Sequence, residues 1–240
     1  MKIEVCLSPS LVHLFELEGK NVVVVDILRA TSCMVTGLAN GIEAIIPVAE
    51  VDECRRIQET GLIAAAERDG MKVEGFDLDN SPFSYMDKKL TGQTIVVTTT
   101  NGTQAIEKSK KAAEIIIGSF LNLTAVSNLL LETKRDVLII CAGWKGHFNL
   151  EDTLFAGALI SKLKSETDLD QDSALAALAL YEANKKDLIG FVKKSSHVKR
   201  LAKLNITKDI EFCVTEDLYN IVPTFVEGKL IASTIETTIN

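Results

Sequence analysis

The side chains best suited to chemistry near the start of the chain are Asp26, Arg29 and Thr31, which follow a run of four valines. An unbroken run of β-branched residues suits a strand buried on both faces, as in a parallel sheet. Ligands of open α/β sheets bind beyond the carboxyl ends of the strands, where helix N-termini attract anions. We therefore expect Asp26 to bind a metal ion beside a phosphate held by Arg29 and Thr31. An Asp26–Arg29 ion pair that only stiffens the turn is the alternative.

A second set of candidates lies in residues 66–82, a long glycine-containing segment that is rich in acids. Glu67, Arg68 and Asp77 are its main candidates. Long loops in compact domains are usually functional or disordered, and the apolar Phe76 argues against disorder. Carboxylates at this density suit Mg²⁺, which needs only one or two of them besides water and substrate oxygens. A solvated acidic loop is the alternative.

A polar turn follows the apolar residues 94–98 and contains Asn101, Gly102 and Thr103. Its hydroxyl, its amide and the backbone N–H groups that a glycine leaves accessible suit an anion such as phosphate. A threonine-rich cap at the start of a helix is the alternative.

The third group of candidates follows the apolar residues 137–141. Lys145 lies in the glycine-containing segment 143–146 and would bind an anionic group. Glu151 and Asp152 come next, at the start of a helical stretch, and are further candidates for metal binding. Acidic residues in a first helical turn are favoured by the helix dipole in any case, so both explanations stay open.

The elements that would position these side chains alternate between strands and helices. We predict a three-layer α/β fold with mostly parallel sheets, built from two similar β-α-β-α-β halves whose loops face one another, and an α-rich C-terminal region. Residues 1–88, including the acidic loop, form the first half and residues 89–165 the second. Residues 166–240 supply helices and closing strands, expected at 210–214, 222–226 and 229–231, that pack with the halves.

Composition excludes several classes of function. The 33 acidic and 26 basic residues give a net charge of -7, which argues against nucleic acid as a partner. The five widely spaced cysteines are expected to be buried, reduced thiols. The first residues do not resemble a signal peptide and no apolar run approaches the ~20 residues of a membrane helix, so we expect a cytoplasmic protein with no membrane partner.

Four motifs together resemble one known family. VVVDILRAT (23–31), ERDGMKVEGFDLDNSP (67–82), TTTNGT (98–103) and CAGWKGHFNLEDTLFAG (141–157) occur in the order found in the 2-phosphosulfolactate phosphatase family. The resemblance implies a Mg²⁺-dependent phosphoric monoester hydrolase that converts 2-phosphosulfolactate to 3-sulfolactate and phosphate, a reaction of coenzyme M biosynthesis. Two positions depart from the family pattern, because Asp79 and Val198 stand where the family usually has glycine.

The resemblance and the chemistry of the side chains lead to one set of expected roles. The expected catalytic residues are Asp26, Glu67 and Arg29. The expected substrate-binding residues are Arg29, Thr31, Arg68, Asn101, Gly102, Thr103 and Lys145. The expected Mg²⁺ ligands come from Asp26, Glu67, Asp77, Glu151 and Asp152. The substrate would be a small polyanionic phosphate ester, and the sequence leaves open whether the chain forms a homodimer.

Three other classes of protein were compared with this assignment. Haloacid dehalogenase-like phosphatases need a second Asp two residues after the first, and that position is Leu28. A nucleotide-binding dehydrogenase is disfavoured because no G-x-G-x-x-G opens a helix. A non-catalytic α/β anion-binding module remains the alternative, although clustered carboxylates beside arginines argue against it.

Overall fold

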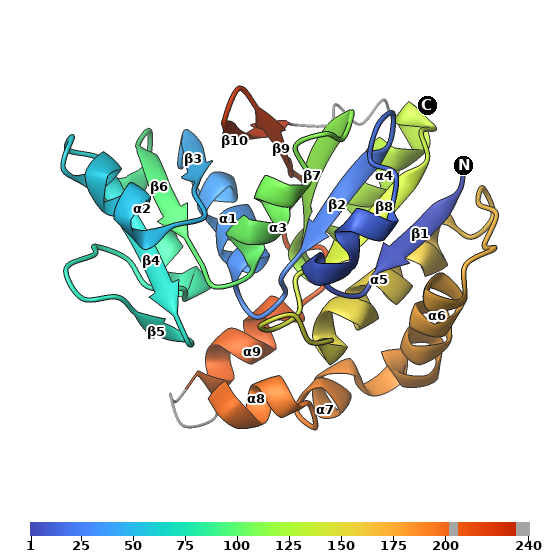
Figure 1. Ribbon diagram of the computed structural model, residues 1–240. Helices are drawn as coiled ribbons and strands as arrows, with labels where there is room; N and C mark the ends of the chain where they lie inside the picture. Colours follow the sequence, from blue (N-terminus) through green and yellow to red (C-terminus); the bar gives the residue numbers. More distant parts are fainter. Residues whose placement is uncertain (202–205, 234–240) are drawn as a thin grey trace.

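One mostly parallel sheet runs through the protein, whose structure is a computed structural model that describes residues 1–201 and 206–233 (Figure 1). The described residues form ten strands. Their order across the sheet is β1 (Ile3–Cys6), β8 (Val137–Cys141), β2 (Asn21–Val25), β7 (Glu114–Gly118), β9 (Val222–Val226), β10 (Lys229–Ser233), β3 (Ala44–Pro47), β6 (Thr94–Thr98), β4 (Ile63–Arg68) and β5 (Met71–Lys72).

The sheet contains two groups of parallel strands joined by an antiparallel hairpin. β1, β8, β2 and β7 form the first parallel group, and β3, β6 and β4 form the second. The C-terminal hairpin β9–β10 lies between them, with β9 beside β7 and β10 beside β3. Each group takes strands from residues 1–88 and from residues 89–165, so the two halves of the sequence interleave in the sheet.

Helices cover both faces of the first parallel group and give three layers. Val23 and Val25 of β2 pack in one apolar cluster with α4 (Leu123–Thr133) and α5 (Leu150–Leu163). Val22 and Val24 pack in a second cluster, with α1 (Ala30–Ala39) and α3 (Gly102–Lys108). Alternate side chains of a strand point to opposite faces, so the valine run fills both cores. The predicted three-layer α/β fold and its doubly buried strand are confirmed.

The remaining helices pack around these layers. α2 (Val51–Gln58) covers the second parallel group, and α6 (Asp172–Asn184) packs against α5. Figure 1 shows α7 (Leu188–Val192), α8 (Ser196–Leu201) and α9 (Thr207–Cys213) along the lower side of the sheet. The 3₁₀ segments are Pro9–Leu14, Pro82–Met86, Lys88–Leu90, Phe120–Asn122 and Lys185–Asp187.

The strand expected at residues 210–214 is wrong, because most of this segment belongs to α9. Ile210, Cys213 and Val214 are buried, and their spacing of three and four residues places them on one face of a helix. The helical face packs into the core on the α5 side of the sheet.

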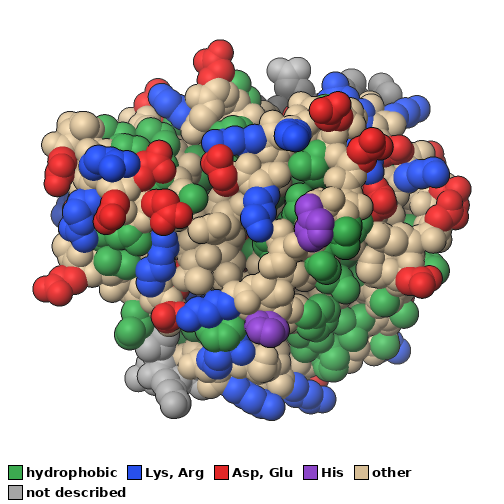
Figure 2. All heavy atoms as spheres, in the orientation of Figure 1, with side chains coloured by type: hydrophobic (Ala, Val, Ile, Leu, Met, Phe, Trp, Pro, Cys, Tyr) green, Lys and Arg blue, Asp and Glu red, His purple; other side chains and the backbone are tan. Residues whose placement is uncertain are grey.

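The distribution of surface charges and the state of the cysteines are as the composition predicts. Acidic and basic side chains are intermixed on the face shown in Figure 2. All five cysteines are buried free thiols, as expected. Among the helices of the described residues, none combines the length and apolar character needed to cross a bilayer.

Candidate active site

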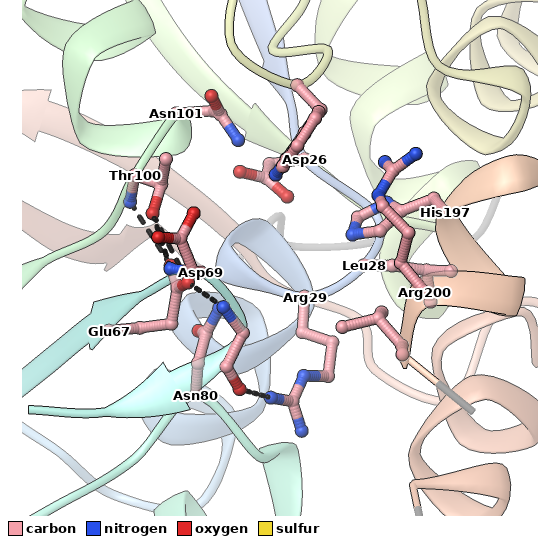
Figure 3. Close-up of a pocket in the computed structure, with 13 residues that line it drawn as sticks. Asp26, Leu28, Arg29, Glu67, Asp69, Asn80, Thr100, Asn101, His197 and Arg200 are labelled. Atoms are coloured by element: carbon pink, nitrogen blue, oxygen red, sulfur yellow. Dashed lines mark hydrogen bonds between the residues drawn. The ribbon is translucent and has the colours of Figure 1, made fainter. Parts of the chain in front are cut away.

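A polar pocket opens at the carboxyl ends of the parallel strands, between the two strand groups (Figure 3). β2 leads into Asp26 and Arg29, β4 into Glu67, and β6 into Asn101. α8 supplies His197 and Arg200 from the C-terminal region. The pocket is therefore lined by four residues that the sequence predicted: Asp26, Arg29, Glu67 and Asn101. An open α/β sheet is expected to bring such distant loops together at the carboxyl ends of its strands.

The backbone around Asp26 is fixed by Thr31. The Thr31 hydroxyl accepts a hydrogen bond from the Asp26 N–H at 3.0 Å and donates one to the Asp26 carbonyl at 2.9 Å. Thr31 is fully buried, so it positions Asp26 and does not line the pocket. Figure 3 shows the Asp26 carboxylate pointing into the space between Asn101 and His197.

Gly102 allows the start of α3 to approach this carboxylate. A Cβ atom at Gly102 would lie 2.8 Å from the Cβ of Ala30 and 3.0 Å from Oδ2 of Asp26. Any larger residue would push α3 or Asp26 aside. The neighbouring Thr103 turns away from the pocket, because its hydroxyl accepts from the N–H of Thr99 at 3.2 Å and donates to the Thr99 carbonyl.

The Asp26 carboxyl has an unusual proton affinity. Burial raises its pKa from the ordinary 3.8 to about 7, the charge of His197 opposes that rise, and the charges of Glu67 and Glu151 add to it. A carboxylate that is costly to ionise in isolation gains from a bound cation or cationic ligand.

Asp26→Asn is expected to stabilise the metal-free protein at high pH. Because the pKa of Asp26 is raised in the folded state, this residue contributes stability that is fully present below its unfolded-state pKa near 3.8. That stability is lost as the pH rises through the folded-state pKa of about 7. The melting temperature of the variant should exceed that of the intact protein by at least about 3 °C at pH 8, with a much smaller difference at pH 5. Asp170→Asn, a change at an exposed carboxyl, is the control. Equal differences at both pH values would contradict a raised Asp26 pKa.

Glu67 links two loops at the edge of the pocket. Its carboxylate accepts hydrogen bonds from the N–H of Gly70, from the N–H of Thr100 at 3.1 Å and from the Thr100 hydroxyl at 3.2 Å. The side chain of the next residue, Arg68, donates hydrogen bonds to the Thr98 hydroxyl and to the Ala49 carbonyl. Arg68 is thus placed to join β4 to β6, away from the pocket lining.

Arg29 is buried and forms an ion pair with Asp209 of α9. It also donates to the Gly70 carbonyl at 3.1 Å. The simple Asp26–Arg29 ion pair considered above is not found among the ion pairs of the described residues. The charge of Arg29 is already balanced by a carboxylate that lies 180 positions later in the chain.

Lys145 contacts Asn101 but is not among the residues that line this pocket. Its backbone N–H donates to Oδ1 of Asn101 at 3.0 Å, and its ammonium group forms a 2.6 Å ion pair with Asp69. Both charged side chains are half exposed, so this pair contributes little to stability. Lys145 therefore connects the loop after β8 with the acidic segment after β4.

Asp152 joins the ends of β2 and β8. Its two carboxylate oxygens accept from the N–H of Ile27 at 2.9 Å and from the N–H of Gly143 at 3.0 Å. Burial raises the pKa of this carboxyl well above its ordinary range. The side chain is buried and is not among the residues that line the pocket, and its binding of a metal ion stays a prediction.

Asp152→Ala should destabilise the fold, because it leaves two buried N–H donors without an acceptor. The expected loss in the free energy of unfolding is about 2–4 kcal/mol, measured by urea denaturation at pH 7. Asp152→Asn keeps one acceptor oxygen and removes the cost of burying an ionised carboxyl, so its loss should be well below that of the alanine variant. A loss below about 0.5 kcal/mol for the alanine variant would contradict this structural role.

Glu151 and His197 form a buried pair that the sequence did not reveal. Oε1 of Glu151 lies 2.5 Å from Nδ1 of His197, and the Asn149 amide lies 3.3 Å from the same nitrogen. Glu151 is completely buried, and its Oε2 atom has no hydrogen-bond partner among the described residues. Because Nδ1 is occupied, Nε2 is the ring nitrogen through which His197 can act on the pocket.

Asp77 lies elsewhere. Its carboxylate accepts from the N–H of Ala64 at 2.8 Å and from the side chain of Gln58 at 3.1 Å. Ala64 lies near the start of β4, whereas Glu67 lies near its end. Asp77 therefore holds the returning acidic loop at the other end of the strand and does not line the pocket.

The pocket offers few ligands for a metal ion. Within residues 1–201 and 206–233, no group of three or more His, Cys, Asp or Glu side chains is arranged to hold one. Asp26 and Glu67 nevertheless face the same pocket, and Oδ1 of the buried Asn80 has no hydrogen-bond partner there. Oxygen ligands of this kind fit Mg²⁺, which accepts one or two carboxylates when water and substrate oxygens complete its shell.

Comparison with known proteins identifies the family. The family model described as 2-phosphosulpholactate phosphatase matches residues 6–228. The chain belongs to this family. The resemblance carried by the four sequence motifs of the 2-phosphosulfolactate phosphatase family is thereby confirmed.

Relatives from the same family extend over most of the chain, and each carries the description "Probable 2-phosphosulfolactate phosphatase". The relative from Thermotoga petrophila is 48% identical over 214 residues, which cover 89% of this chain and 92% of its own. The relative from Caldanaerobacter subterraneus is 43% identical over 218 residues, covering 89% and 90%. That from Clostridium acetobutylicum is 38% identical over 236 residues, covering 96% and 100%.

Proposed function

We propose that this protein hydrolyses 2-phosphosulfolactate to 3-sulfolactate and inorganic phosphate. Membership of the 2-phosphosulfolactate phosphatase family supports the reaction. The observation that carries the proposal to this chain is the pocket itself, which combines the protonatable Asp26 with Arg29, His197 and Arg200 at the strand ends. Binding of a small polyanionic ester needs cationic groups of this kind. Hydrolysis also needs charged or polar groups that stabilise the transition state.

Magnesium is part of the proposal. Asp26 and Glu67 would hold the ion, with the Asn80 amide oxygen as a further ligand. Bound Mg²⁺ would neutralise phosphate oxygens as charge develops on them. Burial raises the pKa of Asp26, so a bound cation would stabilise the ionised form of this carboxyl.

The residues of the chain divide the remaining tasks. Asn101 would orient the phosphate from the β6 side, and Arg29 would hold an anionic group near the acidic loop. His197, fixed through Nδ1 by Glu151, would donate a proton from Nε2 to the oxygen that joins the phosphorus to the lactate carbon. That oxygen otherwise leaves as a poorly stabilised alkoxide.

The test is product formation by the intact protein. Phosphorus NMR and proton NMR should detect phosphate and 3-sulfolactate in equal amounts when 2-phosphosulfolactate is the substrate, with turnover in Mg²⁺ and loss of turnover in excess chelator. Binding of 2-phosphosulfolactate without any release of phosphate would instead support the non-catalytic anion-binding module. Turnover that is unchanged by the chelator would remove magnesium from the proposal but leave the phosphatase.

A further inference from the structure

Arg200 carries the positive charge in the pocket that is least compensated. Arg29 is paired with Asp209, and Lys145 is paired with Asp69. Among the ion pairs formed by the described residues, none involves Arg200, although its side chain lines the pocket. An unpaired cation attracts an anionic group of the substrate more strongly than a cation whose charge a neighbouring carboxylate already balances.

The guanidinium of Arg200 is held in place by an aromatic platform. Its central carbon lies 4.1 Å from the centre of the Trp144 ring, and one of its N–H groups donates to the Ser196 hydroxyl at 3.2 Å. Stacking occupies the flat face of a guanidinium and leaves N–H donors at its edge for an anion. Figure 3 shows the guanidinium groups of Arg200 and Arg29 well apart, with that of Arg200 beside His197.

Trp144 is itself fixed by a tight hairpin turn. Its N–H donates to the His147 carbonyl, and the His147 N–H donates to the Trp144 carbonyl, both at 2.9 Å. Lys145 and Gly146, between them, have φ angles of 49° and 82°, as a type I′ turn requires. A Cβ at Gly143 would lie 2.2 Å from the His147 carbonyl oxygen, so this position needs glycine.

We propose that Arg200, stacked on Trp144, binds the sulfonate group of the substrate. This assignment rests on the proposed function. The carboxylate carbon is bonded directly to the phosphate-bearing carbon, whereas the sulfonate is bonded to the methylene carbon next to it, so the sulfonate is the end of the molecule that reaches farther from the phosphate. With the phosphate beside Asp26, that end reaches the exposed rim, where Arg200 lies, whereas the buried Arg29 lies on the side of the acidic loop. Arg200 is thus the residue that selects sulfonated phosphate esters.

The experiment compares two substrates that differ only in this group: 2-phosphosulfolactate and 2-phospholactate, which has a hydrogen in place of the sulfonate. For Arg200→Gln, the KM for 2-phosphosulfolactate should rise about 10–100-fold with kcat within about threefold, because a charged hydrogen-bonded contact is lost. The KM for 2-phospholactate should change less than about twofold. Trp144→Ala should shift selectivity in the same direction by a smaller factor.

Arg135→Gln is the matched control, because it removes the same charge at the N-terminal side of β8, away from the pocket. Equal losses on both substrates for Arg200→Gln would overturn the sulfonate assignment and leave the phosphatase intact. If the intact protein hydrolyses neither substrate, the proposed function fails. Calorimetric binding of 3-sulfolactate then decides the Arg200 assignment, which requires weaker binding by Arg200→Gln than by Arg135→Gln.

Discussion

Asp26→Asn is expected to lower kcat/KM for 2-phosphosulfolactate by a factor on the order of 10³ or more, with a folded and stable protein. The substitution keeps the size of the side chain and removes its ability to ionise. Asp26 lies where the phosphate, the cation and His197 would meet, so its charge would act at the reacting centre. Steady-state phosphate release at pH 7, with circular dichroism of both proteins, measures the effect.

The matched comparison for this prediction is Asp77→Asn. Both residues were candidates for metal binding, but the Asp77 carboxylate lies at the start of β4, away from the pocket. Asp77→Asn should keep kcat/KM within about threefold of the intact value, apart from any loss of stability. Comparable losses for the two variants would show that position in the pocket is not what makes Asp26 important.

The second large effect is expected for His197→Asn, and it should depend on the leaving group. Hydrolysis of 2-phosphosulfolactate expels an alkoxide, so loss of a general acid should lower kcat by about 10²–10⁴-fold. p-Nitrophenyl phosphate releases a stable phenolate that needs no proton. Its turnover by the variant should fall by less than about tenfold, because the missing proton transfer contributes little there.

Glu151→Gln tests how His197 is held. The amide keeps a polar atom near Nδ1 but removes the carboxylate that pairs with the ring. We expect the same dependence on leaving group as for His197→Asn, with a smaller loss of kcat. If His197→Asn lowers the turnover of both esters equally, His197 binds the phosphate and does not protonate the leaving oxygen.

The core of the fold could be predicted from local sequence patterns. Residues 22–25 are four valines, and a strand buried on both faces is the arrangement that buries all of them. The expected strand at residues 210–214 failed because short apolar segments suit a strand or one face of a helix equally well. The position of the hairpin β9–β10 between the two parallel groups depends on long-range pairing, which local patterns do not encode.

The pocket was predictable where a residue comes within a few positions of the carboxyl end of a strand. Asp26 and Asn101 are of this kind, since parallel strands bring their carboxyl ends to one edge. Asp77 was not, because the acidic loop returns along β4 and the sequence does not show which end of the strand each carboxylate reaches. Asp209 was also beyond local reasoning, because only the packing of α9 brings it to Arg29.

His197 illustrates a different limit. A histidine without another histidine or cysteine nearby gives no sequence signal for a site, although the segment around it resembles part of the family pattern. Its position becomes informative only when Glu151, 46 positions earlier, is found 2.5 Å from Nδ1. Distance in the folded chain, and not residue type alone, identifies this pair.

The most direct measurement is a crystal structure of Asp26→Asn soaked with 2-phosphosulfolactate and Mg²⁺, since the variant should bind substrate without turning it over. We predict electron density for the intact ester in the pocket at the strand ends, with its phosphate beside residue 26 and Asn101 and its sulfonate at Arg200. Density for the ester at another surface, with this pocket filled only by solvent, would contradict the central claim that hydrolysis takes place at the ends of β2, β4 and β6.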